Sequence, residues 1–333
     1  MTDMSTKPSA AGPDLSEAFT SPVARPPSAW QKGFDRAFQR IAYAFGIGVV
    51  LLLGGIVFKV MERATTAMGS YGLGFLTTSA WDANRAQFGI LPEIVGTLYT
   101  SILALLIGGF LGITVALVLS QGFVPRRVEL VMKNIVELLA AIPSVVYGLW
   151  GIFVLVPAVR GPAGWLNEHF ESVPFFSTRL SGPGILPAAL VLSIMILPTV
   201  TAICREAMAA VPKRLAAAAY GLGATRWEVI FKVTLPTAVG GIFGALVLGF
   251  GRALGETMAL AMLVGNANVF GWSLFSPGNT LAALLANHFP EAATVEVGAL
   301  MYAAVVLMLI TLAVNALGSF LMLRTTRELK GLG

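Results

Sequence analysis

Arg252 and Glu256 are ionisable residues in a stretch that is otherwise almost free of polar side chains. They lie in GFGRALGETMALAML, within the apolar run 240–264. An arginine at the centre of a membrane helix costs roughly 2.5–3.5 kcal/mol on insertion scales, so an offsetting interaction or a function is expected. Their spacing of four places both side chains on one face of a continuous helix, where Gly251 and Gly255 leave room for a small anion.

Two interpretations of this pair are open. In one, Arg252 and Glu256 form a buried ion pair that holds the helix in register. In the other, Arg252 supplies positive potential and hydrogen-bond donors to an anion, and Glu256 orients the guanidinium or accepts a proton-bearing anion oxygen. Intramembrane ionisable residues usually mark ion routes. We therefore assign Arg252, Glu256 and Thr257 to a substrate pathway.

Motifs that would indicate an enzyme are missing from the sequence. None of the seven lysines follows a glycine, so no phosphate-binding GxxxxGK[ST] loop is present. HExxH and GxSxG are also missing, which argues against a protease or hydrolase. Cys204, His169 and His288 give no zinc-ligand spacing, and Cys204 is expected to be a packing residue. We expect no catalytic site, no metal and no cofactor, so energy must come from a partner.

The composition indicates a polytopic membrane protein. Of the 333 residues, 56% are hydrophobic and only 12% are charged. A bilayer core needs roughly 20 apolar residues per helix, and long continuous runs favour helices over a barrel. The expected fold class is all-α with six transmembrane helices. The apolar runs are 41–59, 94–120, 134–159, 184–204, 238–265 and 295–323.

The distribution of Lys and Arg predicts the orientation in the membrane. Of 22 such residues, sixteen lie in the two termini and in the second and fourth connections, and five in the other connections. The positive-inside rule then places both termini in the cytoplasm. The net charge of +5 has the same origin, which disfavours nucleic-acid binding.

Three regions follow from these patterns. Residues 1–38 are rich in Pro, Ser and Ala and predict a disordered cytoplasmic tail. Residues 39–325 are expected to form the six-helix transmembrane domain, with 205–236 as its long cytoplasmic loop, and 326–333 a short cytoplasmic tail. Helix three is expected to kink at Pro143.

The longest cytoplasmic connection, residues 205–236, has an internal order of its own. Its sequence is REAMAAVPKRLAAAAYGLGATRWEVIFKVTLP. Pro212 can open a helix that the alanines extend and that Gly221 and Gly223 end. Thr225-Arg226-Trp227-Glu228 has the pattern of a capping box, which starts a second helix that Pro236 is expected to stop.

This loop resembles the EAA loop of binding-protein-dependent ABC importer permeases. The resemblance rests on residues that match at the family spacing: Ala217, Ala218, Ala219, Gly223, Val233, Leu235 and Pro236. Alanine at 217 replaces the usual glutamate, and valine at 233 the usual isoleucine. In that family the loop inserts into a cleft of the cytoplasmic ATPase, which implies an ATPase-coupling loop here. A DNA-binding helix-turn-helix is disfavoured because membrane helices tether both ends.

Longer blocks are similar to phosphate transport system permeases of the PstC family. They are FGILPEIVGTLYTSILALLIG, ELLAAIPSVVYGLWGIF, GLGATRWEVIFKVTLP, GFGRALGETMALAMLVGN and PGNTLAALLANHFPEA. The resemblance implies the type I, MetI-like permease fold in the bacterial cytoplasmic (inner) membrane. It also implies four partners besides membrane lipid, namely a second homologous permease of PstA type, two copies of a PstB-type ATPase and an external PstS-type phosphate-binding protein.

Two alternatives stay open at this point. A permease for sulfate, molybdate or another oxyanion would share the 205–236 loop but is expected to lack the GRALGET helix. A secondary transporter driven by an ion gradient commonly carries internal repeats, which are not evident in these six helices.

Overall fold

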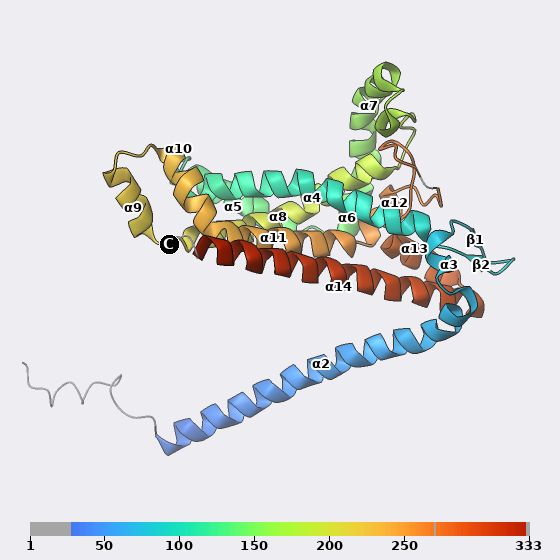
Figure 1. Cartoon of the computed structure of the whole chain (residues 1–333), viewed down its shortest axis with the longest axis horizontal. Coiled ribbons are helices and arrows are strands. Elements are labelled where there is room, and N and C mark those ends of the chain that lie inside the picture. The colour runs from blue at the N-terminus through green and yellow to red at the C-terminus, as the bar shows by residue number, and fades with distance from the viewer. Residues whose placement is uncertain (1–27, 270, 331–333) are drawn as a thin grey trace, which may run out of the picture. The chain divides into compact units, whose positions relative to one another are not determined.

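The computed structural model of the chain describes residues 28–269 and 271–330 (Figure 1). Contacts divide the chain into two units, residues 1–59 and 60–333. Each is described by itself. Helix α2 (Ala29–Tyr71) continues through the boundary between them.

The start of α2 corrects the predicted N-terminal tail. Residues 1–27 of the predicted tail 1–38 lie outside the described residues, but α2 begins at Ala29. The Ser28 backbone N–H donates to Gln31 Oε1 at 2.8 Å, and the Gln31 N–H donates to Ser28 Oγ at 3.3 Å. This is a capping box, which starts the helix inside a segment whose composition predicted disorder.

Six helical segments in the described ranges are long and apolar enough to cross a membrane, which confirms the predicted all-α, six-helix class. They are Trp30–Tyr71, Leu91–Ser120, Ser144–Phe170, Ile185–Ala209, Arg226–Leu254 and Thr294–Met322. The one sheet seen in the described residues is a two-stranded antiparallel pair in which Trp81 faces Phe88.

The elements follow one another in this order after α2. They are α3 (Gly74–Thr77), β1 (Trp81–Asp82), β2 (Gln87–Phe88), α4 (Leu91–Ser120), α5 (Arg126–Ala141), α6 (Ser144–Trp150), the π-helical η1 (Gly151–Leu155), α7 (Val156–Phe170), η2 (Pro174–Phe176), α8 (Ile185–Ala209), α9 (Lys213–Gly221), α10 (Arg226–Val229), the π-helical η3 (Ile230–Thr234), α11 (Leu235–Leu254), α12 (Met258–Leu263), α13 (Leu281–His288), η4 (Phe289–Glu291) and α14 (Thr294–Lys330). Helix α14 therefore extends five residues past the predicted domain boundary at 325.

The predicted third helix, 134–159, is two helices. Helix α5 ends at Ala141, and Ile142 and Pro143 are extended before α6 begins at Ser144. A proline disfavours helical backbone in the residue that precedes it. Pro143 therefore ends α5 instead of kinking a continuous helix. The apolar run 134–159 had suggested one helix because it combines the second half of α5 with the first part of the membrane span that starts at Ser144. Helix α5 is amphipathic and has no buried residues.

Helices α4, α8, α11 and α14 run along one another and form the frame of the second unit (Figure 1). Small residues let the backbones approach. A Cβ on Gly108 of α4 would lie 2.5 Å from the Ser193 carbonyl oxygen of α8, and one on Gly112 would lie 2.9 Å from Val200. Helices α4 and α8 are therefore in close contact at this glycine pair. Cys204 is fully buried beside Val200, as expected of a packing residue.

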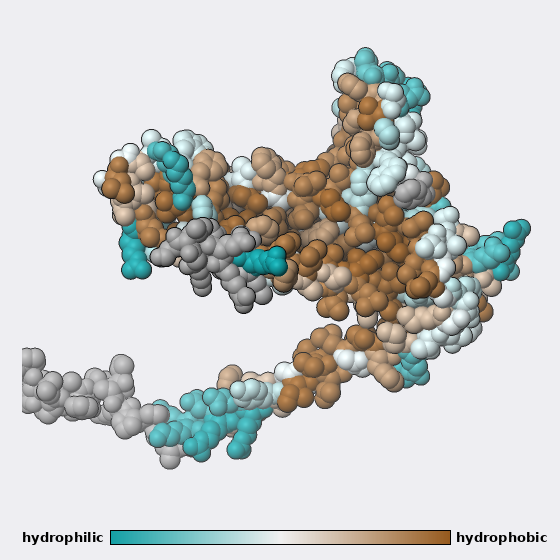
Figure 2. All heavy atoms as spheres, in the orientation of Figure 1, coloured by the Kyte–Doolittle hydropathy of each residue, from teal (hydrophilic) through white to brown (hydrophobic). Residues whose placement is uncertain are grey.

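The outer surface of the frame is apolar. Figure 2 shows hydrophobic residues over the bundle, with hydrophilic residues at the β1–β2 turn and at the tip of α7. Phe110 is 71% exposed and Leu312 is 66% exposed. Such side chains are stable against lipid tails and not against water, which agrees with a multi-pass membrane protein.

We predict that Gly108→Ala destabilises the bundle because the added methyl group forces α4 away from the α8 backbone. Overpacking of this kind costs about 1–3 kcal/mol. The matched control is Gly164→Ala in α7, where a Cβ meets nothing within 4 Å. The melting temperature of the detergent-solubilised protein should fall for Gly108→Ala and stay the same or rise for the control. Equal melting temperatures would contradict close packing at Gly108.

Candidate functional site

The first helix of the 205–236 loop ends in a complete Schellman motif. Helix α9 ends at Gly221, and the Ala224 N–H donates to the Ala219 carbonyl at 3.1 Å while the Gly223 N–H donates to Tyr220 at 2.9 Å. Gly223 has φ +85°. A left-handed residue at this position is what the motif requires, and glycine adopts it without a Cβ penalty.

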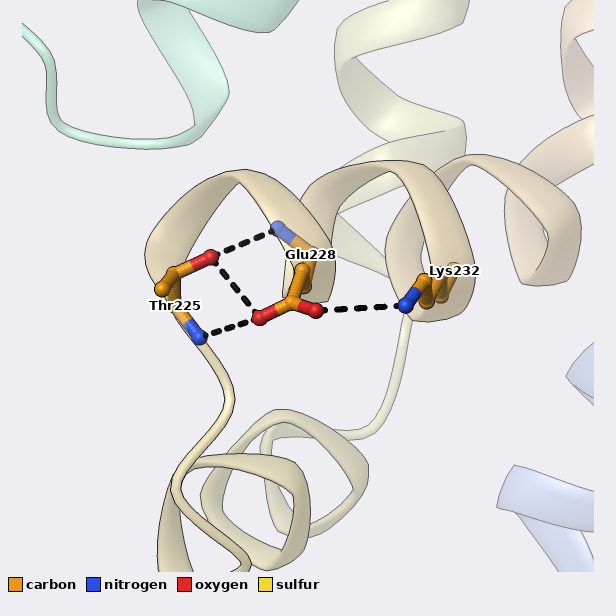
Figure 3. Close-up of polar contacts among 3 residues, drawn as sticks. All are labelled: Thr225, Glu228 and Lys232. Atoms are coloured by element: carbon orange, nitrogen blue, oxygen red, sulfur yellow. Dashed lines mark hydrogen bonds and ion pairs between the residues drawn. The ribbon is translucent and has the colours of Figure 1, made fainter.

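The second helix starts at the predicted capping box (Figure 3). The Glu228 N–H donates to Thr225 Oγ1 at 3.4 Å, and the Thr225 N–H donates to Glu228 Oε2 at 2.9 Å. The other carboxylate oxygen, Oε1, pairs with Lys232 Nζ at 3.2 Å. The reciprocal bonds satisfy two of the N–H groups that a helix start leaves unpaired. The predicted order of helix, glycine turn and capped helix is therefore confirmed.

The predicted stop at Pro236 is wrong. Helix α10 continues through the π-helical η3 into α11, and Pro236 is in the first turn of α11. Proline lacks an N–H, and a π-helical turn directly before it shifts the backbone pairing by one residue, so the missing donor is tolerated. Val233, Leu235 and Pro236 accordingly belong to the start of the fifth span.

The family-motif residues thus lie in two places. Ala217 and Ala218 are exposed on α9 and Ala219 is half-buried, with Gly223 in the turn. Leu235 packs on the buried cluster of α4, α8 and α11. The first group forms an exposed face, and the second anchors the loop to the bundle.

Sequence reasoning missed how the loop contacts the α4–α5 turn. The Arg226 guanidinium donates to the Gln121 carbonyl oxygen and lies 3.9 Å above the Phe123 ring, which also packs against Trp227. Gln121 is the C-cap of α4, where carbonyl groups lack helical partners and a cation is favoured. In the sequence Arg226 indicated only the orientation of the chain in the membrane, so its contact with Gln121 and Phe123 could not be predicted.

The apolar run around Arg252 is not one helix. Helix α11 ends at Leu254, and α12 begins at Met258. Arg252 is therefore in the last turn of α11, not at the midpoint of a helix, and Glu256 lies in the break. The prediction that the two side chains share a helical face is wrong, because two helix ends replace one continuous helix.

The structure also gives no ion pair between Arg252 and Glu256; the ion pairs of the described residues lie elsewhere. Arg252 is exposed at the C-terminus of α11, and Glu256 precedes α12, with Oε1 at 3.5 Å from the Ala259 N–H. A cation at a helix C-terminus and an anion at a helix N-terminus are each stabilised by the backbone dipoles. Half-buried Thr257 donates its hydroxyl to the Gly255 carbonyl oxygen at 3.2 Å.

Residues 108–327 match the family of binding-protein-dependent transport system inner membrane components. The phosphate transport system permease protein PstC of Mesorhizobium japonicum is 38% identical over 296 residues, which cover 87% of this chain and 90% of that one. PstC of Pasteurella multocida is also 38% identical, with 87% and 92% covered. The chain belongs to the PstC family.

Solved structures confirm the type I, MetI-like permease fold for this PstC-family chain. A chain of the bacterial alginate ABC transporter, solved with an alginate-bound periplasmic protein, has a TM-score of 0.61 at 18% identity, covering 88% of this chain and 97% of that one. A chain of the inward-facing MetNI methionine ABC transporter has a TM-score of 0.54 at 18% identity, covering 71% and 95%.

Two buried polar groups of this PstC-family chain were not predicted. Tyr147 of α6 lies within electrostatic range of Arg252 and donates its hydroxyl to the Leu139 carbonyl at 2.8 Å. Glu93, in the first turn of α4, is fully buried and accepts from Asn279. In the sequence Glu93 is an acidic residue directly after Pro92, at a position typical of the first turn of a helix. Nothing in the sequence therefore indicated that its side chain is buried. No metal-binding group of three His, Cys, Asp or Glu side chains occurs among the described residues.

We predict that Gly223→Ala loosens the loop whereas Gly221→Ala does not. A left-handed non-glycine residue costs roughly 1–2 kcal/mol, but Gly221 is helical and a Cβ there meets nothing within 4 Å. Hydrogen–deuterium exchange of amides 218–229 should speed up in Gly223→Ala only. Equal exchange in the two variants would show that the positive φ at Gly223 does not determine the turn.

Proposed function

We propose that this chain is a membrane permease subunit of an ATP-driven importer of inorganic phosphate and forms half of the translocation pathway. The observation that carries the proposal is the break at Gly255, which leaves the Arg252 guanidinium exposed at a helix end within a PstC-family sequence. Interrupted membrane helices place ion sites at their ends in many transporters. The relatives named phosphate transport system permeases support phosphate as the substrate.

Arg252 is the residue that meets the anion in this proposal. A guanidinium keeps its charge at all physiological pH values and presents several N–H donors to phosphate oxygens. Glu256 and Thr257, next along the break, add an acceptor and a hydroxyl. Phosphate carries a proton and can donate a hydrogen bond to such an acceptor, whereas sulfate is fully ionised and cannot. Glu256 therefore favours phosphate over sulfate.

The partners follow from the proposed importer. A second, homologous permease of PstA type completes the pathway, a PstB-type ATPase dimer binds the 205–236 loops, and a PstS-type protein delivers phosphate from outside. Both termini lie in the cytoplasm of a bacterium, and the six spans lie in its inner membrane. ATP is hydrolysed by the partner ATPase, and closure of its dimer changes the side from which the pathway is open.

We predict that Arg252→Gln abolishes phosphate uptake by proteoliposomes containing the whole importer, while assembly is retained. Glu256→Gln should weaken uptake less. Arg85→Gln, which removes an exposed arginine far along the chain, is the control. Because no ion pair joins the two residues, the Arg252→Glu/Glu256→Arg exchange should stay inactive.

Rescue of uptake by the exchange, or undiminished flux in a well-folded Arg252→Gln complex, would overturn the pathway assignment. Competition identifies the substrate: excess sulfate or molybdate should leave phosphate uptake unchanged. Inhibition by either oxyanion at equal concentration would contradict phosphate as the transported anion. Loss of uptake on removing ATP, but not on collapsing the proton gradient, separates this importer from a secondary transporter.

We predict that Ala217→Glu preserves the ATPase contact. Ala217 is exposed on α9, and the family usually carries glutamate there, so the longer side chain has space. Gly223→Val serves as the reference that should release the ATPase, since it obstructs the left-handed turn. The amount of ATPase that copurifies and its phosphate-stimulated hydrolysis measure both effects. Loss of the ATPase in Ala217→Glu would mean that α9 docks through a different face.

A further inference from the structure

Glu93 is a buried acid for which the proposed pathway has no use. Its side chain is fully buried, Oε1 accepts a hydrogen bond from Asn279 Nδ2 at 3.3 Å, and Oε2 has no hydrogen-bond partner among the described residues. Asn279 is only 4% exposed. Burial of a carboxyl group with an unpaired oxygen is costly. A carboxyl group buried at such a cost is expected to have a role, and its hydrogen bond to Asn279 indicates where in the structure that role lies.

The surrounding hydrogen bonds attach the start of α13 to α4. The Leu281 N–H donates to Thr97 Oγ1 at 2.9 Å, and the Thr97 hydroxyl donates to the Glu93 carbonyl oxygen at 2.6 Å. The Thr280 N–H donates to Asn279 Oδ1 at 2.9 Å. Gly96 of α4 lies directly under the Asn279 backbone, where no Cβ has room. The contact is therefore both close-packed and polar.

Residues 271–280, which we call the outer segment, connect this contact to the C-terminal end of α12, the helix that follows the break. The Gly278 N–H donates to the carbonyl oxygen of Val264, the C-cap of α12, at 2.9 Å. The Ile185 and Leu186 N–H groups at the start of α8 donate to Ser276 and Leu274. The outer segment is thus held between α4, α8 and α12, at the end of the bundle away from α9 and α10 (Figure 1).

We propose that Glu93 is a positioning residue that keeps the outer end of the anion pathway closed by holding the outer segment through Asn279. The proposal rests on the proposed function, which places the pathway at the break that α12 follows. Glu93 does not touch the anion. It acts through Asn279: loss of this hydrogen bond weakens the attachment of the outer segment to α4 and raises the fraction of molecules in which the segment moves and the break is open to the outside.

The chemistry of the contact predicts a specific order of variants. Glu93→Gln keeps an oxygen acceptor for the Asn279 amide and should remain closed. Glu93→Ala leaves the amide without a partner and should open. Asn279→Asp places two carboxyl groups against each other and should also open. In the Glu93→Gln/Asn279→Asp double variant, the glutamine amide donates to the new carboxylate, so closure should return.

The test measures the access of an impermeant maleimide to Thr257→Cys, in a Cys204→Ala background, from outside right-side-out vesicles that contain the whole importer without ATP. Asn279→Asp and Glu93→Ala should raise the labelling rate about tenfold, the population shift expected from loss of a buried hydrogen bond. Glu93→Gln and the double variant should label at the starting rate. The matched control is Asn84→Asp, which adds the same charge at an exposed position of the β1–β2 turn.

Labelling of Asn279→Asp no faster than Asn84→Asp in assembled complexes would overturn the proposal. Opening by Glu93→Gln as large as by Glu93→Ala would also overturn it, since the hydrogen bond would then not be the cause. If Asn279→Asp does not assemble, the comparison of Glu93→Gln with Glu93→Ala decides. Labelling needs no phosphate, so an error in the proposed substrate leaves these rates unchanged and is detected only by the uptake assays.

Discussion

Inside a bilayer the chain has to satisfy its own backbone hydrogen bonds, and the rest of this structure depends on that constraint. The break at Gly255 leaves helix ends that a lipid cannot pair. They are stabilised by Arg252 at the end of α11 and by Glu256 before α12. Because unpaired backbone groups are costly in lipid, polar side chains are placed at the break. Polar side chains of this kind are also what an anion pathway needs.

The frame that supports the break is built from small residues. Gly108 and Gly112 let α4 contact the α8 backbone. At Gly251 of α11, an added Cβ would lie only 3.2 Å from Asn315 Oδ1 of α14. The hydrophobic effect contributes little to the association of membrane helices, because lipid tails are as apolar as the side chains. Van der Waals contacts between closely packed helices provide the stability instead. This is why glycines occur where helix propensity alone would disfavour them.

Most of the fold and part of the site could be predicted from the sequence. Long apolar runs determine the six spans, and the local pattern from Thr225 to Glu228 determines the capping box and the turn at Gly223. Predictions that assumed continuity were wrong: Pro143 separates two helices, and Gly255 separates Arg252 from Glu256. Hydropathy reports the average polarity of a run and not its backbone path, so a break within an apolar run leaves no signal in it.

Glu93 shows a second limit of sequence reasoning, because its partner is 186 residues away. A first-turn acid is favoured by the helix dipole whether it is exposed or buried, so residue type and position do not distinguish the two cases. The contact with Asn279 also shows that α4 connects two regions of the structure. One end receives Arg226 of the 205–236 loop at Gln121, and the other end holds the outer segment through Glu93 and Asn279, about 42 Å away along α4. These are the two regions to which the proposed function assigns ATPase coupling and the entry of the anion. Any tilt of α4 against α8 therefore displaces both contacts together, and its close packing at Gly108 limits how much tilt is available.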